Sequence, residues 1–115
     1  DGSRFNIDAT MIKSSYLFHI DKNPDVSASR KVLDNQIISG YTCMECDRLF
    51  QYKNQEELVP GDRIVYENVG GYTMSLNPLF IQYFPAVYVK DGTRLNMVRK
   101  KWTPEEYVQG SITED

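Results

Sequence analysis

Cysteine and histidine are scarce in this chain, which has two cysteines and one histidine among 115 residues. Two cysteines three positions apart do not form the disulfide framework of a small secreted domain, so we expect a reducing, cytoplasmic compartment. A structural zinc site needs four soft ligands, and only His19 is available to join Cys43 and Cys46. The sequence therefore gives neither a disulfide scaffold nor a zinc protein much support.

An excess of positive charge is also missing, and so is any long apolar run. The net charge of -3 argues against binding to a phosphate backbone. The longest apolar stretch, residues 78–89, is interrupted by Gln82 and Pro85 and is too short to span a membrane. No secretory or transit signal is visible at the start of the sequence. We therefore expect no nucleic acid and no membrane among the partners.

Aromatic residues are abundant: the chain has eight tyrosines, five phenylalanines and one tryptophan. Together with many valines and isoleucines they favour strands, where such side chains pack on a pleated surface. A loop is predicted over residues 22–30, because they contain Asn23-Pro24-Asp25. Strands are predicted over residues 16–20, 36–42, 47–52 and 63–67, the last one after a turn at residues 60–62.

The clearest local signal is Asp91-Gly92, which separates the alternating runs at residues 86–90 and 93–98. It predicts a hairpin in which both turn positions take positive φ. A short helix is predicted after Thr103, which can cap it, with Pro104 in the first helical position and Gly110 as its stop. The chain is thus expected to be mainly β, with antiparallel strands and a short C-terminal helix.

The first residues form an unusual pattern. Asp1-Gly2-Ser3 looks like the tip of a hairpin, yet no strand precedes it. A turn with one arm indicates that the chain was cut from something longer. The alternative is the remnant of a tag followed by a true start.

Three short motifs could each have a functional role, but each also has a purely structural interpretation. Cys43 and Cys46 form a C-x-x-C, but the residues that follow favour a strand rather than the helix of a redox motif, so buried structural cysteines are the alternative. His19 lies in an apolar segment with no nucleophile assigned to it, so a hydrolase triad has no support. The glycine pair at residues 70–71 could approach an anion or simply form a tight turn.

Acidic residues are scattered through the middle of the chain. We expect most of them to be solvated, and none forms a glycosidase-like pair: Asp47, Glu56, Glu57 and Asp62.

Four segments carry more meaning together than alone. In chain order they are residues 40–47 (GYTCMECD), 58–62 (LVPGD), 67–73 (ENVGGYT) and 98–106 (VRKKWTPEE). They resemble the motifs G-P-T-C-x-x-x-D, L-x-x-G-D, E-N-x-G-A-Y-T and R-R-R-E-T-x-E-D. These are motifs of the fold-type III decarboxylases that use pyridoxal 5'-phosphate (PLP), the ornithine/diaminopimelate decarboxylase family. The resemblance covers nearly the whole chain.

The resemblance implies a fold and an assembly. Residues 1–115 would be a single C-terminal β domain, a Greek-key-like β-barrel or sandwich. The family's PLP-binding (β/α)₈ barrel, with its Schiff-base lysine, is not in this sequence. The chain would therefore be a fragment of a two-domain, homodimeric amino-acid decarboxylase, and would be inactive alone.

The resemblance also implies site residues. Cys43 matches the catalytic cysteine, which the family contributes across the dimer interface and which can serve as a general acid. Tyr72 matches the tyrosine that donates a hydrogen bond to the cofactor phosphate, and Phe80 matches an aromatic residue of the substrate pocket. A register that aligns Cys46 with the catalytic cysteine puts Tyr72 and Phe80 three residues out of step, so Cys46 is interpreted as structural.

Departures from the motifs bear on the substrate. Met44 stands where the family usually has Asp or Glu against the substrate's distal ammonium, and Met cannot pair with a cation. Glu45 could substitute, but in a strand it would point to the opposite face. Ile81 stands for Asn. We therefore hypothesise a substrate other than free lysine, ornithine or diaminopimelate, such as an amino acid conjugated to something larger.

Two other hypotheses stay open. One is a free-standing β-barrel module that binds a ligand through exposed aromatic side chains, because the acidic charge does not disfavour sugars or peptides. The other is a C-x-x-C redox or metal protein.

Overall fold

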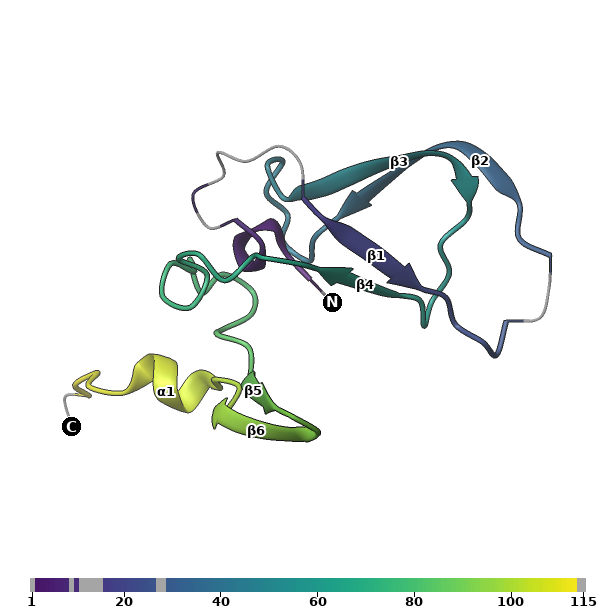
Figure 1. Cartoon of the computed structure of the whole chain (residues 1–115). Coiled ribbons are helices and arrows are strands. Elements are labelled where there is room, and N and C mark those ends of the chain that lie inside the picture. Colours follow the sequence, from purple (N-terminus) through teal and green to yellow (C-terminus); the bar gives the residue numbers. More distant parts are fainter. Residues whose placement is uncertain (1, 9, 11–15, 27–28, 114–115) are drawn as a thin grey trace. The chain divides into compact units, whose positions relative to one another are not determined.

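The structure is a computed structural model that describes residues 2–8, 10, 16–26 and 29–113. The chain divides into two compact units, Asp1–Leu76 and Asn77–Asp115. The described residues are mainly β, as predicted, with strands that pair two by two and one short α-helix (Figure 1). The elements are η1 (Arg4–Asn6), β1 (Phe18–Asp21), β2 (Val32–Ser39), β3 (Arg48–Glu56), β4 (Arg63–Tyr66), β5 (Val87–Asp91), β6 (Arg94–Arg99) and α1 (Pro104–Val108).

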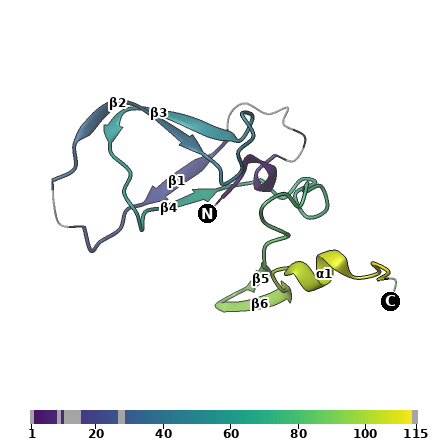
Figure 2. The same ribbon diagram turned by 180° about the vertical axis from the view of Figure 1, so that it is seen from behind.

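The first unit contains two antiparallel pairs of strands. β1 pairs with β4 (Figure 2), and in this pairing Phe18 lies opposite Tyr66. β2 pairs with β3, so that Ile38 lies opposite Phe50, and an irregularity follows Ile38. No closed barrel forms among the described residues, because β4 and β2 each pair on one side only.

An aromatic cluster joins the two pairs of strands. The ring centroids of Phe18 and Phe50 are 4.3 Å apart, and Tyr66 lies 5.8 Å from Phe18 and 6.3 Å from Phe50. The side chains of β1 and β4 alternate between partly buried and exposed, which is the pattern of a sheet with one covered face. Among the described residues of this unit, the buried apolar side chains are those of Ile7 and Leu49.

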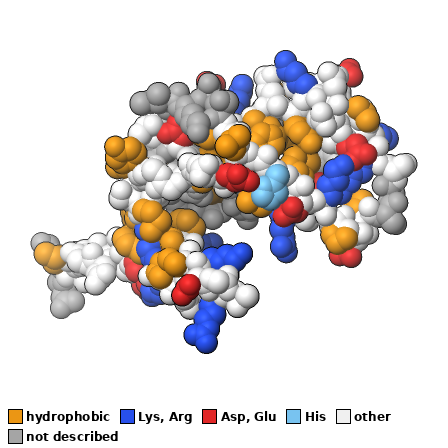
Figure 3. All heavy atoms as spheres, viewed as in Figure 1, with side chains coloured by type: hydrophobic (Ala, Val, Ile, Leu, Met, Phe, Trp, Pro, Cys, Tyr) orange, Lys and Arg blue, Asp and Glu red, His pale blue; other side chains and the backbone are white. Residues whose placement is uncertain are grey.

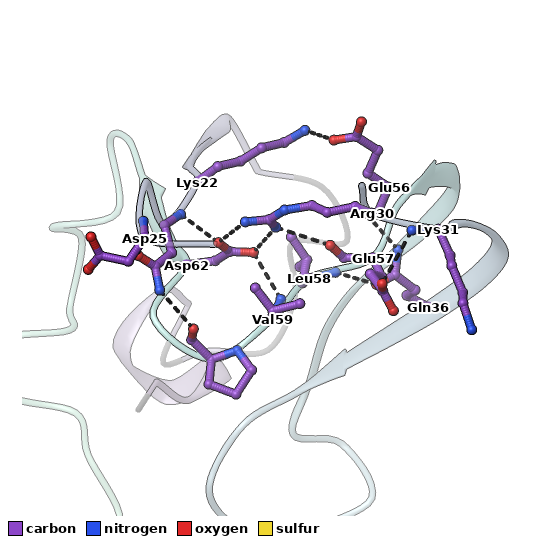
Figure 4. Close-up of polar contacts among 12 residues, drawn as sticks. Lys22, Asp25, Arg30, Lys31, Gln36, Glu56, Glu57, Leu58, Val59 and Asp62 are labelled. Carbon is purple, nitrogen blue, oxygen red and sulfur yellow. Dashed lines mark hydrogen bonds and ion pairs between the residues drawn. The ribbon is translucent and has the colours of Figure 1, made fainter. Parts of the chain in front are cut away.

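A buried ion pair connects the loop before β2 to the turn before β4. The Arg30 guanidinium donates to both carboxylate oxygens of Asp62, at 2.6 and 2.9 Å, and the Asn23 and Val59 backbone N–H groups donate to the same carboxylate (Figure 4). The Arg30 and Asp62 side chains are 7% and 3% exposed. The hydrogen bonds from Arg30 hold the pKa of Asp62 well below its ordinary range, even though burial opposes this. Asp62 is therefore not among the solvated acids, because its fixed partners replace water.

The second unit holds the predicted hairpin, with its turn one residue later than expected. Asp91 pairs with Arg94, so the two loop residues are Gly92 and Thr93 rather than Asp91 and Gly92. Of these two loop residues, only Gly92 has a positive φ, at 58°. Glycine with positive φ at the first loop position alone is the pattern of a type II′ turn.

The predicted terminal helix is confirmed as α1. Thr103 is its N-cap and Pro104 begins it, and Gly110 follows it with φ of 87°. The Glu106 carboxylate accepts a hydrogen bond of 2.7 Å from the Thr103 N–H, which satisfies a backbone donor that no helical carbonyl can reach. The Phe84 ring packs edge-on against Trp102 in the same unit. Neither η1 nor α1 has the length and apolar character of a membrane-spanning helix.

Most of the predicted strands are present, although some of their ends differ. Residues 63–66 and 48–52 are strands, and the described part of residues 22–30 holds neither helix nor strand. The strand expected over residues 16–20 begins at Phe18, and the one expected over residues 36–42 ends at Ser39. Residues 40–42 form a bend instead, because their backbone N–H groups donate hydrogen bonds to residues 2 and 47 rather than to a partner strand. Asp1, from the predicted hairpin tip, lies outside the described residues.

Candidate functional site

The loop that joins β2 to β3, residues 40–47, carries the candidate catalytic cysteine. A tight turn closes it, because the Asp47 N–H donates to the Met44 carbonyl at 3.0 Å. Cys43 and Cys46 are both exposed and free, so the alternative of two buried structural cysteines is wrong. The loop therefore presents two accessible thiols.

Asp47 anchors this loop from inside the protein. It is 1% exposed, and its carboxylate accepts hydrogen bonds from the Ser3 hydroxyl at 2.9 Å and the Arg4 N–H at 2.7 Å. Thr42 donates twice, through its N–H at 3.1 Å and its hydroxyl at 2.5 Å. Burial alone would raise the pKa of Asp47, but these hydrogen bonds outweigh it and lower the pKa. With Asp62 also buried, two of the four acids Asp47, Glu56, Glu57 and Asp62 are withdrawn from solvent, so the expectation that most of them are solvated was wrong.

Gly40 is needed at its position because it has no side chain, which leaves room for the Asp47 carboxylate. A Cβ at this position would collide with the carboxylate of Asp47. The Gly40 N–H also donates to the Asp47 carbonyl at 2.8 Å, and the Tyr41 N–H donates to the Gly2 carbonyl at 2.9 Å. Gly40, Thr42 and Asp47 thus support the loop, whereas residues 43–46 form its exposed tip. The sequence signal for this division is the spacing G-x-T-C-x-x-x-D.

Met44 and Glu45, the candidate substrate contacts, lie beside Cys43 on this exposed tip. The prediction that strand geometry would point them to opposite faces was wrong, because residues 44–47 form a turn rather than a strand. Met44 is 42% exposed. Both side chains are therefore available to a molecule that approaches the thiol of Cys43.

Tyr72, the candidate phosphate contact, lies on a separate turn of the same unit. Its carbonyl accepts hydrogen bonds from the N–H groups of Ser75 and Leu76, at 3.1 and 2.8 Å. Its φ of 64° is left-handed, which is uncommon for a residue other than glycine, and its side chain is 69% exposed. Strained residues of this kind concentrate at functional sites.

The glycine pair beside Tyr72 does not supply that left-handed conformation. Among residues 67–73, positive φ occurs at Asn68 and Tyr72 and at neither Gly70 nor Gly71. Both glycines have open space where a Cβ would lie. Alanine therefore fits at position 71, as in the motif that the segment resembles.

Phe80, the candidate pocket residue, belongs to the second unit and is 44% exposed. Its neighbours Leu79 and Ile81 have φ of 53° and 70°. A β-branched residue in this conformation is a backbone outlier. The motif resemblance points to Phe80 and Ile81, but no feature of the sequence indicates this strain.

His19 lies on the exposed face of β1, in the region that Figure 3 shows with acidic side chains beside the histidine. Its Nδ1 is 3.4 Å from the Glu67 carboxylate and its Nε2 is 3.8 Å from that of Asp21. Within the described ranges, no three His, Cys, Asp or Glu side chains gather in a way that could hold a metal ion.

A cavity of about 680 Å³ lies elsewhere in the first unit. Residues of η1, β2, β3 and β4 line it, and neither Cys43 nor Tyr72 does. The candidate cysteine and tyrosine are both exposed and lie outside this cavity.

No protein-family model, curated protein or solved structure matches this chain.

Proposed function

We propose that this chain is the C-terminal β domain of a PLP-dependent amino-acid decarboxylase of the ornithine/diaminopimelate type. The full protein would be a cytoplasmic homodimer with a (β/α)₈ barrel that holds most of the PLP, and the β domain would complete a Greek-key-like barrel. The observation that carries the proposal is the loop at residues 40–47. The positions shared with the motif, Gly40, Thr42 and Asp47, support the loop from around the buried Asp47 carboxylate and leave Cys43 exposed.

Cys43 would act as the general acid of the reaction. When bound, PLP accepts the electron pair that remains after the carboxyl group leaves as carbon dioxide. The carbon that lost the carboxyl group then needs a proton, which the Cys43 Sγ would hold and deliver. An accessible thiol on a rigidly supported loop fits this role, because a group that serves a site on another domain must project from its own.

Tyr72 and Phe80 would each supply one further contact. The exposed Tyr72 side chain leaves its hydroxyl available to donate to a phosphate oxygen. Phe80 would line the substrate pocket. The left-handed backbone at Tyr72, Leu79 and Ile81 supports a functional role for these segments, because such strain persists where a side chain must be aimed.

The substrate would be an amino acid without a free distal ammonium against residue 44, such as an amino-acid conjugate. Met44 offers apolar surface beside the thiol, and Glu45 lies on the same turn. Glu45 is exposed rather than enclosed, so it would contact the outer part of the substrate. If meso-diaminopimelate proved to be the fastest substrate in a panel with ornithine, lysine and Nε-acylated lysine, this assignment of specificity would be wrong.

The proposal is tested on the natural gene product by its visible absorption before and after borohydride. We expect a band from lysine-bound pyridoxal that borohydride removes. In that protein, Cys43→Ala should retain the band and lose decarboxylation at least about a hundredfold, the range of a general acid. Cys46→Ala is the matched control and should retain most activity.

Two outcomes would reject the proposal. A colourless product that takes up no added PLP would favour a free-standing ligand-binding module. Loss of the band in Cys43→Ala would assign this cysteine a structural role.

A further inference from the structure

The two cysteines of the chain lie together on the exposed tip of the loop at residues 40–47. Cys43 and Cys46 are both exposed, and both thiols are free. Exposure is one of the conditions that make a cysteine open to oxidation, because the oxidant reaches the sulfur from solvent. Either thiol can therefore react with a small oxidant.

A bond between the two sulfurs requires the chain between them to bend. A disulfide joins residues whose Cα atoms are roughly 4.4–6.8 Å apart. Three residues of extended chain span about 10 Å. A strand through residues 43–46 would therefore keep the two thiols apart, whereas a turn brings them within reach of one another.

Hydrogen bonds bend the chain at this point. The Asp47 N–H donates to the Met44 carbonyl at 3.0 Å, which closes a four-residue turn with Cys46 in its third position. The Met44 N–H in turn donates to the Thr42 hydroxyl at 3.4 Å, across Cys43. Each cysteine thus lies within a short hydrogen-bonded loop of the chain.

The two ends of this tip are also tied to each other. Thr42 donates to one oxygen of the Asp47 carboxylate through its N–H, at 3.1 Å, and through its hydroxyl, at 2.5 Å. Asp47 is 1% exposed and has further donors in Ser3 and Arg4, so it is fixed in place. A segment of four residues whose flanking residues are in contact is not extended, so the fold holds the two thiols near each other before any reaction.

We propose that Cys43 and Cys46 form a reversible oxidation site, which hydrogen peroxide converts to an internal disulfide. One thiolate attacks peroxide, so that an S–O bond forms, the O–O bond breaks and hydroxide leaves. The second thiolate attacks the sulfenic sulfur, so that the S–S bond forms and a second hydroxide leaves. The two sulfurs lose two electrons to peroxide, and the two thiol protons convert the hydroxides to water.

The effect of this oxidation on activity rests on the proposed function, in which the Cys43 thiol holds the proton that the substrate carbon receives. A sulfur in a disulfide has no proton to deliver, so oxidation would stop decarboxylation. A dithiol would restore it by reducing the bridge. Disulfides of this transient kind are the ones found in a reducing compartment.

Cys46 thereby gains a function that the motif comparison did not assign to it. A sulfenic acid that meets a second thiol forms a disulfide, whereas one without such a partner is oxidised further to sulfinic acid, which thiols do not reduce. Cys46 would therefore protect Cys43 from irreversible oxidation.

The test is mass spectrometry of the natural gene product after treatment with hydrogen peroxide and alkylation of the remaining thiols. We expect the peptide that contains Cys43 and Cys46 to lose two hydrogens and to take up no alkyl group. After dithiothreitol it should take up two. Two alkyl groups after peroxide, or disulfide-linked dimers in place of the internal bridge, would overturn the proposal.

Cys46→Ala is the matched variant, because it keeps Cys43 and removes only the second thiol. With the same peroxide treatment, the fraction of Cys43 that dithiothreitol returns to a thiol should be at least about fivefold lower than in the wild type. Equal recovery in the two proteins would show that Cys46 does not protect Cys43, and the proposal would be wrong.

The contribution of the turn is measured by the same equilibrium in the folded and the unfolded chain. In a glutathione buffer, the ratio of disulfide to dithiol should be at least about tenfold higher in the folded protein than in urea, because the turn raises the effective concentration of one thiol at the other. A ratio in urea that equals or exceeds the folded value would contradict the proposal, since the turn would then not favour the bridge.

These readouts need no PLP, so a protein that lacks the cofactor can still pass them, and a PLP enzyme can fail them. In a decarboxylase, oxidation should lower the activity at least about a hundredfold, the range of a general acid, and dithiothreitol should restore it. Activity that survives complete formation of the disulfide would reject the role of Cys43 in the proposed function and leave the oxidation site itself established.

Discussion

The carboxylate of Asp47 fills the space beside Gly40 in which any other residue would place its Cβ. The same carboxylate binds Ser3, the Arg4 backbone and Thr42, so it has no freedom to move aside. One buried acid thereby fixes the bend after β2 and the position of Cys43. The stability of the first unit and the geometry of the candidate site are coupled at this point.

Gly40→Ala should destabilise the chain strongly. The added methyl group displaces Asp47 and leaves buried donors unpaired, at about 1–3 kcal/mol for each. Gly70→Ala is the matched control, because a Cβ there meets open space, and it should change stability by less than about 1 kcal/mol. Urea unfolding at neutral pH measures both. Equal stability of the two variants would refute the role assigned to Asp47.

Acid should weaken the fold through Asp47 and Asp62. Both carboxyl groups have a folded pKa below the ordinary value of about 3.9, so the unfolded chain binds protons first as pH falls. Their contribution is complete above about pH 5 and decreases below about pH 4 toward the lowered pKa values. Urea midpoints from pH 7 to 3 check this. In Asp62→Asn the urea midpoint should decrease less between pH 5 and pH 3 than in the wild type. A wild-type midpoint that does not change down to pH 3 would contradict the prediction.

Arg30→Met should cost much more stability than Lys22→Met. Arg30 is paired with Asp62 in a buried fork, so its loss leaves that carboxylate buried without its counter-charge. Lys22 forms a comparable pair with Glu56, but both of these side chains are about half exposed. Exposed pairs contribute little because water and salt screen them. Comparison of the two melting temperatures tests this, and an equal decrease would show that burial of the pair is unimportant.

Ile81→Asn should stabilise the chain by about 1 kcal/mol. Asparagine tolerates the left-handed conformation that Ile81 adopts at φ of 70°, and this side chain is 57% exposed, so little burial is lost. Ile37→Asn is the control, since Ile37 is 51% exposed but lies in β2 without positive φ. We expect that control to be neutral or destabilising in urea unfolding. A decrease in stability for Ile81→Asn would mean that the isoleucine side chain has a packing role.

Local sequence patterns were enough to predict the hairpin, the helix and most of the strands. Asp91-Gly92 predicted the hairpin and Thr103-Pro104 predicted the helix, because turn and cap chemistry depends on adjacent residues. Even there, the register of the hairpin turn differed by one residue. Aromatic and β-branched residues located β1 and β4, since such side chains pack well on a sheet with one covered face.

The burial or exposure of the polar residues depends on contacts between distant parts of the chain, which local patterns do not reveal. Nothing in their local sequence distinguishes Asp47 and Asp62 from exposed acidic residues. Their burial depends on hydrogen-bond donors from residues 3, 4, 30 and 42, none of which is adjacent to them in the sequence. The same contacts end β2 at Ser39 and place Cys43 on a bend, against the local preference for a strand. Long-range hydrogen bonds overrule local preference here because a buried carboxylate without partners would cost more than a short strand gains.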